Sequence, residues 1–147
     1  SGPASDAVSA SGPPPALPTD LTGTLIERMG LEFLEVGAQR LVARMPVEGN
    51  TQPYGLLHGG ASCVLAETLG SVGAATHAAG LGGIAVGVDI NATHHRGVRY
   101  GWVTGVAEAI SLGRSVAAYQ IVISDDDGRR VCTARLTCVI RPKPPGA

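Results

Sequence analysis

One segment of this chain is too apolar and too rich in small residues to lie at the surface of a globular protein. Between Gly49 and Val88, a stretch of forty residues, Glu67 is the only Asp, Glu, Lys or Arg. Within it, residues 58–79 have the length of one long helix, and apart from Glu67 this helix has no charged face to turn towards water. We therefore expect a helix that is buried nearly all round, with a sheet wrapped closely against it.

The segments on either side of this helix predict a short helix and six strands. The short helix is expected at residues 21–29, with Asp20 as its N-cap and Gly30 as its end. A hairpin turn is expected around Asp127–Gly128. Segregated helices and antiparallel strands indicate an α+β fold, in which one sheet curls around the long helix. Alternating apolar residues predict strands at 31–36, 40–47, 84–94, 102–112, 116–124 and 130–140.

Length and composition set the limits of the domain and of its surroundings. The chain has 147 residues, enough for one core, and its net charge of −1 gives no electrostatic case for nucleic acid or a membrane as partner. Eight of the ten prolines lie in the first twenty residues or after Arg141. We expect an N-terminal tail at 1–20, one domain at 21–141 and a C-terminal tail at 142–147.

The cysteines and histidines predict neither a disulfide framework nor a metal site. The three cysteines lack paired spacing, and the four histidines form no recognisable ligand set with them. Residues 1–20 also lack the pattern of a signal peptide. We therefore expect a cytoplasmic protein in which the three cysteines are small buried residues with free thiols.

The isolated carboxylate of Glu67 points to chemistry. Burying an unpaired carboxylate costs several kcal/mol, so the group is a paired structural one or a working one. No Lys or Arg on the predicted helix can pair with it. Ser71 stands four residues further, on the same helix face, where its hydroxyl can bind either the carboxylate or its own helix turn.

The order of several residues resembles that in the hotdog-fold acyl-CoA thioesterases, particularly the 4-hydroxybenzoyl-CoA branch that uses a Glu on the long helix. The stretches GVDINATHHRG (87–97) and SLGRSVAAYQIVISDDDGR (111–129) are similar to those of bacterial 1,4-dihydroxy-2-naphthoyl-CoA and enterobactin-pathway proofreading thioesterases. The resemblance covers residues 25–141. It implies a hotdog fold, a curved antiparallel sheet around one long central helix, and hydrolysis of acyl-CoA thioesters. The matching residues are Gln52, His58, Gly59, Gly60, Glu67, Ser71 and His94.

Two groups at different points of the helix fit thioester hydrolysis. Gly59, at the helix start, has a free N–H at the positive end of the helix dipole and no side chain to block the thioester oxygen. Glu67 is expected to attack the carbonyl or to activate a water, and both routes stay open. Eight residues on one helix span about 12 Å, so one subunit cannot bring both groups to the same thioester. Glu67 must then face Gly59 of another subunit, and the resemblance implies a homodimer with shared sites and a dimer of dimers.

The resemblance also implies roles for the remaining residues. Gln52 donates to the acyl carbonyl or holds the helix start, and His58 supports the loop. Gly60 and His94 lie along the substrate. Strand alternation puts His94, rather than His95, on the inner face together with Val88, Ile90 and Ala92. Of the candidate cations for the CoA phosphates, Arg114 matches a position where the relatives often carry a basic residue, and Arg96 and Arg99 flank the loop after His94.

The sequence leaves the substrate partly open. The resemblance points to aromatic acyl groups, such as hydroxybenzoyl or dihydroxynaphthoyl, carried by coenzyme A rather than by an acyl-carrier protein. No cofactor is expected beyond coenzyme A as part of the substrate. One alternative is a hydroxyacyl dehydratase or hydratase on the same fold, although these enzymes place a His and a carboxylate at another spacing. A second alternative is a non-catalytic acyl-CoA-binding module.

Overall fold

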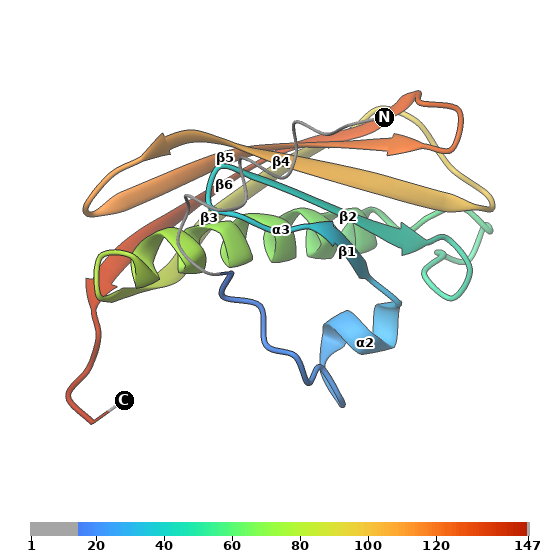
Figure 1. The fold of residues 1–147 in the computed structure, drawn as a ribbon. Coiled ribbons are helices and arrows are strands. Elements are labelled where there is room, and N and C mark those ends of the chain that lie inside the picture. Colours follow the sequence, from blue (N-terminus) through green and yellow to red (C-terminus); the bar gives the residue numbers. More distant parts are fainter. Residues whose placement is uncertain (1–14, 147) are drawn as a thin grey trace, which may run out of the picture.

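Residues 15–146 of the chain, which the computed structural model describes, form one antiparallel sheet and one long helix (Figure 1). The long helix α3 runs along one face of the curved sheet, as expected for the hotdog architecture. The strand order is β1-β2-β4-β5-β6-β3, and all neighbours are antiparallel. The elements are α2 (Leu25–Met29), β1 (Glu32–Glu35), β2 (Arg40–Pro46), α3 (Gly59–Ala79), β3 (Gly83–His94), β4 (Trp102–Leu112), β5 (Val116–Asp125) and β6 (Arg130–Pro142).

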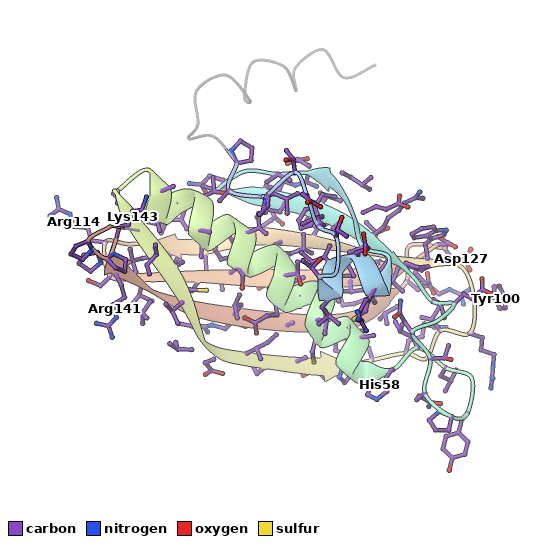
Figure 2. The ribbon with its side chains drawn as sticks, turned by 90° about the horizontal axis from the view of Figure 1, so that it is seen from below. His58, Tyr100, Arg114, Asp127, Arg141 and Lys143 are labelled. Carbon is purple, nitrogen blue, oxygen red and sulfur yellow. The ribbon has the colours of Figure 1, made fainter. Side chains whose placement is uncertain are left out.

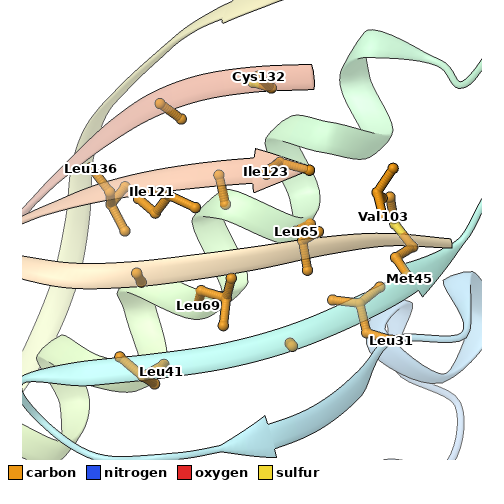
Figure 3. Close-up of a cluster of buried hydrophobic side chains, with 14 of the residues drawn as sticks. Leu31, Leu41, Met45, Leu65, Leu69, Val103, Ile121, Ile123, Cys132 and Leu136 are labelled. Carbon is orange, nitrogen blue, oxygen red and sulfur yellow. The ribbon is translucent and has the colours of Figure 1, made fainter. Parts of the chain in front are cut away.

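The core lies between α3 and the inner face of the sheet (Figure 3). Leu65 and Leu69 of the helix pack among side chains of β2, β4, β5 and β6, and both are fully buried. The small residues of α3 permit this close contact. A β-carbon at Gly73 would lie 2.8 Å from the ring of Tyr119, and one at Gly70 would lie 2.5 Å from Leu136. Replacing either glycine would therefore push the helix away from the sheet.

The expectation that α3 is buried all round was wrong for the single chain. One sheet covers only one side of the helix, and the other side remains half-buried. The neighbouring edge strand β3 also exposes apolar side chains, with Val86 46% and Val88 56% exposed. The half-buried stripe of α3 consists of Cys63, Val64, Glu67, Thr68, Ser71, Val72 and Ala75.

The short helix begins later than expected. α2 starts at Leu25, where the Thr24 hydroxyl accepts a hydrogen bond from the N–H of Glu27. Asp20 does not cap this helix, because its carboxylate accepts from the N–H of Thr22 instead. Hydrogen bonding by Thr22, first through its side chain and then through its N–H, lowers the pKa of Asp20. The helix ends at Gly30, as expected, with a left-handed φ of 76° that favours glycine.

Strand β3 contains a bulge that sequence alternation does not show. Gly87 pairs with Cys138, but Asp89 pairs with Thr137, so Val88 is an extra residue between them. The bulge therefore interrupts the alternation expected through Val88, which has no pairing partner in β6 and is 56% exposed. Beyond the bulge, Ile90, Ala92 and His94 pair with Leu136, Ala134 and Cys132, which are all buried.

The other expected elements are confirmed to within two residues at each end, including the Asp127–Gly128 turn, where Gly128 has a φ of 78°. The proposed domain boundaries stay a prediction, and residues 1–14 and 147 lie outside the described part. The first described residues pass the helix, where the N–H of Ala16 donates to the Thr76 hydroxyl at 3.1 Å. Within residues 15–146, no helix has the length and apolar character needed to span a membrane.

Candidate active site

The start of α3 leaves one backbone N–H free to bind a ligand. His58 is the N-cap, and its Nδ1 accepts a hydrogen bond of 2.8 Å from the N–H of Gly60. The carbonyl oxygen of His58 accepts from Ala61 at 2.9 Å. The N–H of Gly59, the first helical residue, has no acceptor within residues 15–146. It lies at the positive end of the helix dipole, where developing negative charge is stabilised.

The loop before α3 is held by Asn50, a residue that the sequence did not single out. The Asn50 amide donates to the carbonyl oxygens of Met29 and Pro46, both at 2.8 Å. The backbone carbonyl oxygen of Asn50 accepts a hydrogen bond of 2.9 Å from the N–H of His58. Asn50 thus fixes the cap, and with it the direction of the Gly59 N–H.

Gln52 lies in the same loop with its amide nitrogen available. The backbone N–H of Gln52 donates to Leu56 at 2.8 Å, and its side-chain oxygen accepts from the N–H of Tyr54. The side-chain nitrogen has no acceptor within the described part of the chain. This assignment of oxygen and nitrogen follows from the hydrogen bond to Tyr54. The free NH₂ group can therefore donate to a substrate carbonyl.

His94 lies beside the helix start, and its neighbour His95 faces the other side of the sheet. A β-carbon at Gly59 would lie 3.0 Å from Nε2 of His94. His95 instead places its Nε2 2.9 Å from the hydroxyl of Thr133. Strand alternation thus correctly predicted which of the two histidines turns inward.

A cleft of about 420 Å³ joins several of the expected residues. A larger depression of about 530 Å³ lies elsewhere and contains none of them, so the smaller cleft is the one that fits the chemistry. Arg96 stands at the rim of the smaller cleft, exposed and without an ion-pair partner among residues 15–146. The lining of this cleft includes Gln52, Gly59, Ser62, His94, Arg96 and Val131.

Glu67 is half-buried, and no cationic side chain of residues 15–146 forms an ion pair with it. The ion pairs within residues 15–146 join Arg40 to Glu35 and Arg44 to Glu32, at the far strands β1 and β2. The Ser71 hydroxyl donates to Oε2 of Glu67 at 3.3 Å, the contact that the four-residue spacing allowed. A structural ion pair therefore does not explain this carboxylate.

The side chain of Glu67 reaches the inner face of the sheet at β3 and β6. A β-carbon at Gly87 would lie 2.8 Å from Oε2 of Glu67. Burial, and secondarily the charge of Glu67, raise the pKa of the Cys138 thiol to about 11. A glycine and a hydroxyl thus lie against the carboxylate, and its charge also acts on a buried thiol whose pKa is raised.

The single chain does not bring all expected residues together. Gly59 and Glu67 lie on one continuous helix, eight residues or about 12 Å apart. Arg114 lies at the opposite end of α3 from His58, together with Arg141 and Lys143 (Figure 2). Among residues 15–146, no cluster of His, Cys, Asp or Glu could hold a metal ion. The cleft is thus lined by Gly59 with its unpaired N–H, whereas Glu67 and Arg114 lie outside it.

Sequence reasoning missed Asn50 and Gly87. A glycine within a strand pattern is a known sign of a bulge or a close approach, and Gly87 shows both. No sequence pattern indicates the role of Asn50, because the fold alone brings the carbonyl oxygens of Met29 and Pro46 to its side chain.

A curved antiparallel sheet around one long helix, with an N–H donor at the helix start and a carboxylate two turns on, defines a hotdog-fold hydrolase of thioesters. Residues 54–132 match the Thioesterase superfamily, and the chain belongs to this family. It is therefore a thioester hydrolase.

Relatives and solved structures agree with this assignment. The chain is 48% identical over 126 residues to the proofreading thioesterase EntH of Cronobacter turicensis, covering 85% of this chain and 91% of that one. A variant of a Pseudomonas aeruginosa thioesterase is similar in structure, with a TM-score of 0.79, 39% identity and coverage of 88% and 99%. A Haemophilus influenzae thioesterase gives a TM-score of 0.77, 36% identity and coverage of 87% and 94%.

Proposed function

We propose that this chain hydrolyses acyl-CoA thioesters to the free acid and coenzyme A. The observation that carries the proposal is the environment of the Glu67 carboxylate. Glu67 is a half-buried carboxylate that is bound by the Ser71 hydroxyl, lies on the uncovered side of α3, and has no ion-pair partner in the part of the chain that the structure describes. Such a carboxylate is available to act on a substrate, because no structural partner neutralises it.

The cleft at the helix start supplies the electrophilic side of the reaction. The thioester oxygen approaches the N–H of Gly59, where the missing side chain leaves room for it. The free amide of Gln52 donates to the same oxygen, and His94, which lines the cleft, lies along the acyl group. Gly60 follows Gly59 outside the cleft lining and lies along the same acyl group in this proposal. Two donors aimed at the oxygen stabilise the charge that develops on it in the transition state.

Glu67 acts on the carbonyl carbon from the opposite side. In one route its carboxylate attacks the carbon, the C–S bond breaks, coenzyme A leaves as thiolate, and water then hydrolyses the acyl anhydride. In the other route Glu67 takes a proton from a water that attacks the same carbon, and the thiolate leaves. Both routes consume one water and yield the acid and coenzyme A.

The site is shared between two subunits of a homodimer. The half-buried stripe of α3 and the exposed apolar edge of β3 form one continuous surface, which a second copy covers. With the two helices antiparallel about a two-fold axis, Glu67 of each chain faces Gly59 of the other. Two such dimers associate into a dimer of dimers. Neither nucleic acid nor a membrane is a partner in this proposal.

The same arrangement places cations for the coenzyme A phosphates. Arg96 stands at the cleft rim, and Arg114 lies at the opposite end of α3. In an antiparallel pair, the C-terminal end of one helix lies beside the N-terminal end of the other. Arg114 of the partner subunit therefore approaches the cleft, and both arginines bind phosphate oxygens.

For the acyl group we propose an aromatic acid of the hydroxybenzoyl or dihydroxynaphthoyl type, processed in the cytoplasm. The similarity to EntH, a proofreading thioesterase, supports an enzyme that clears unwanted acyl groups. The test is a panel of aromatic and aliphatic acyl-CoA thioesters, with thiol release followed by a thiol reagent. Wild type should cleave aromatic members fastest, and Glu67→Gln should lose at least about 10²-fold in kcat. If no member is cleaved, or Glu67→Gln retains full activity, the proposal is wrong.

A further inference from the structure

Gly87 of β3 lies directly under the carboxylate of Glu67. A β-carbon at this position would lie 2.8 Å from Oε2 and 3.9 Å from Cδ of Glu67, and apart from its chain neighbours it would meet no other atom of residues 15–146 within 4 Å. Ordinary van der Waals contact requires about 3.5 Å or more. The carboxylate thus occupies the space that any side chain at residue 87 would need.

The bulge in β3 keeps other groups away from this position. Gly87 is on the inner face opposite Cys138, and Val88 is the extra residue. If Val88 were paired regularly, with no bulge, alternation continued from Gly87 would turn Asp89 to the inner face, on the side of Glu67. The bulge instead pairs Asp89 with Thr137, on the outer face, so Glu67 has no neighbouring carboxylate on this strand.

We infer that Gly87 is a positioning residue that sets the direction of the Glu67 carboxylate. Oε2 rests on the glycine and accepts the Ser71 hydroxyl, while Oε1 accepts no hydrogen bond within residues 15–146. Oε1 is therefore the oxygen left to act on the thioester carbon or its water. This inference rests on the proposed catalytic role of Glu67, and it assigns the support of that role to the backbone of β3.

A methyl group at residue 87 should move the carboxylate and leave the sheet in place. Within residues 15–146 of the same chain, the only atoms that it meets belong to the end of a flexible side chain, which can rotate away. Gly105 offers a contrast, because a β-carbon there would lie 2.8 Å from Leu69 and 3.3 Å from Leu65 in the core. A change at Gly105 would disturb packing, whereas a change at Gly87 disturbs the position of one carboxylate.

The experiment compares Gly87→Ala with wild type and with Gly37→Ala. A β-carbon at Gly37 would lie 3.4 Å from the carbonyl oxygen of Arg40, so this control reports the general effect of adding a methyl group. For Gly87→Ala we expect kcat to fall about 10- to 100-fold with KM nearly unchanged, because small misplacements of a reacting group are costly. The melting temperature and the oligomeric state should match those of Gly37→Ala.

Measuring Gly87→Ala in the Glu67→Gln variant as well as in wild type shows whether Gly87 acts through Glu67. In Glu67→Gln, where the carboxylate is already absent, adding Gly87→Ala should reduce the residual rate by no more than about twofold. The inference is wrong if Gly87→Ala keeps wild-type kcat, or if its loss is equally large in the Glu67→Gln background. It is also wrong if only KM rises, and rises more for larger acyl groups, because Gly87 would then make room for substrate. If the Glu67→Gln variant alone keeps the wild-type rate, the proposed function is wrong, and Gly87 has no catalytic carboxylate to position.

Discussion

The imidazole of His94 lies against the first residue of the long helix, and a β-carbon at Gly59 would lie 3.0 Å from its Nε2 and 3.2 Å from its Cε1. The end of β3 and the start of α3 therefore meet at a point where only glycine fits without moving the ring. This contact places the unused N–H of Gly59 and the ring of His94 on the same cleft.

Replacing Gly59 by Ala should remove most activity without loss of stability. The added methyl group occupies the space beside the N–H that the thioester oxygen needs, and loss of one oxyanion donor costs about 10²–10³ in rate. Alanine also favours a helix over glycine by about 1 kcal/mol. We expect kcat/KM to fall at least about 10²-fold while the melting temperature does not drop. Retention of more than a tenth of the wild-type value would contradict the oxyanion role of Gly59.

The double variant Gly59→Ala/His94→Ala separates two causes of such a loss. It removes the crowding between the methyl group and the ring but keeps the methyl group. If its rate recovers above that of Gly59→Ala, the displaced ring of His94, rather than the blocked N–H, caused the loss.

His58 should contribute to stability through the helix cap. His58→Ala removes the 2.8 Å hydrogen bond to the N–H of Gly60, and loss of an N-cap costs about 1 kcal/mol in the free energy of unfolding. Asparagine is a good N-cap, so His58→Asn should retain stability. Urea titration measures both, with exposed His95→Ala as the control histidine. Equal destabilisation by Ala and Asn would argue against a capping role.

Two buried thiols predict a loss of stability at high pH. Burial, more than neighbouring charge, raises the pKa of Cys132 and of Cys138 from 9.0 to about 11. The folded chain therefore holds these protons more tightly than the unfolded chain. Their stabilising effect is complete below pH 9 and is lost as the pH rises towards 11.

The corresponding measurement is the free energy of unfolding in urea between pH 8 and pH 11. Wild type should lose stability across pH 9–11, and a Cys132→Ala/Cys138→Ala variant, whatever its starting stability, should show a shallower slope. Tyr119, whose pKa burial also raises, accounts for the slope that remains above pH 10. Identical slopes for the two proteins would refute this assignment.

Most of the fold could be predicted because its periodicity is simple. Leu41, Ala43 and Met45 alternate along β2 and are fully buried, as is Val47 just after the strand, which is expected for a sheet with one covered face. The exceptions have local causes. Asp20 and Thr24 are both good N-cap residues, and only the structure shows that Thr24 starts α2. The alternation expected through Val88 is interrupted, because a sequence pattern does not reveal an extra residue in a strand.

The site was predictable in part, for a different reason. The separation of Gly59 from Glu67 follows from helix geometry, and the inward turn of His94 follows from strand alternation. Contacts between distant segments do not follow from either pattern. The carboxylate of Glu67 meets Gly87, and Asn50 reaches Met29 and Pro46, only because the sheet and loops bring them together.

The shared site is tested most directly by mixing two inactive variants. Glu67→Gln and Gly59→Ala subunits are unfolded together at equal amounts, refolded, and assayed on the best thioester, with each variant refolded alone as control. Random pairing makes half of the dimers mixed, and each mixed dimer regains one intact site of two, so about a quarter of the wild-type rate should return. A mixture no more active than the two variants alone, although mixed dimers have formed, would show that Glu67 and the partner's Gly59 do not act on the same thioester.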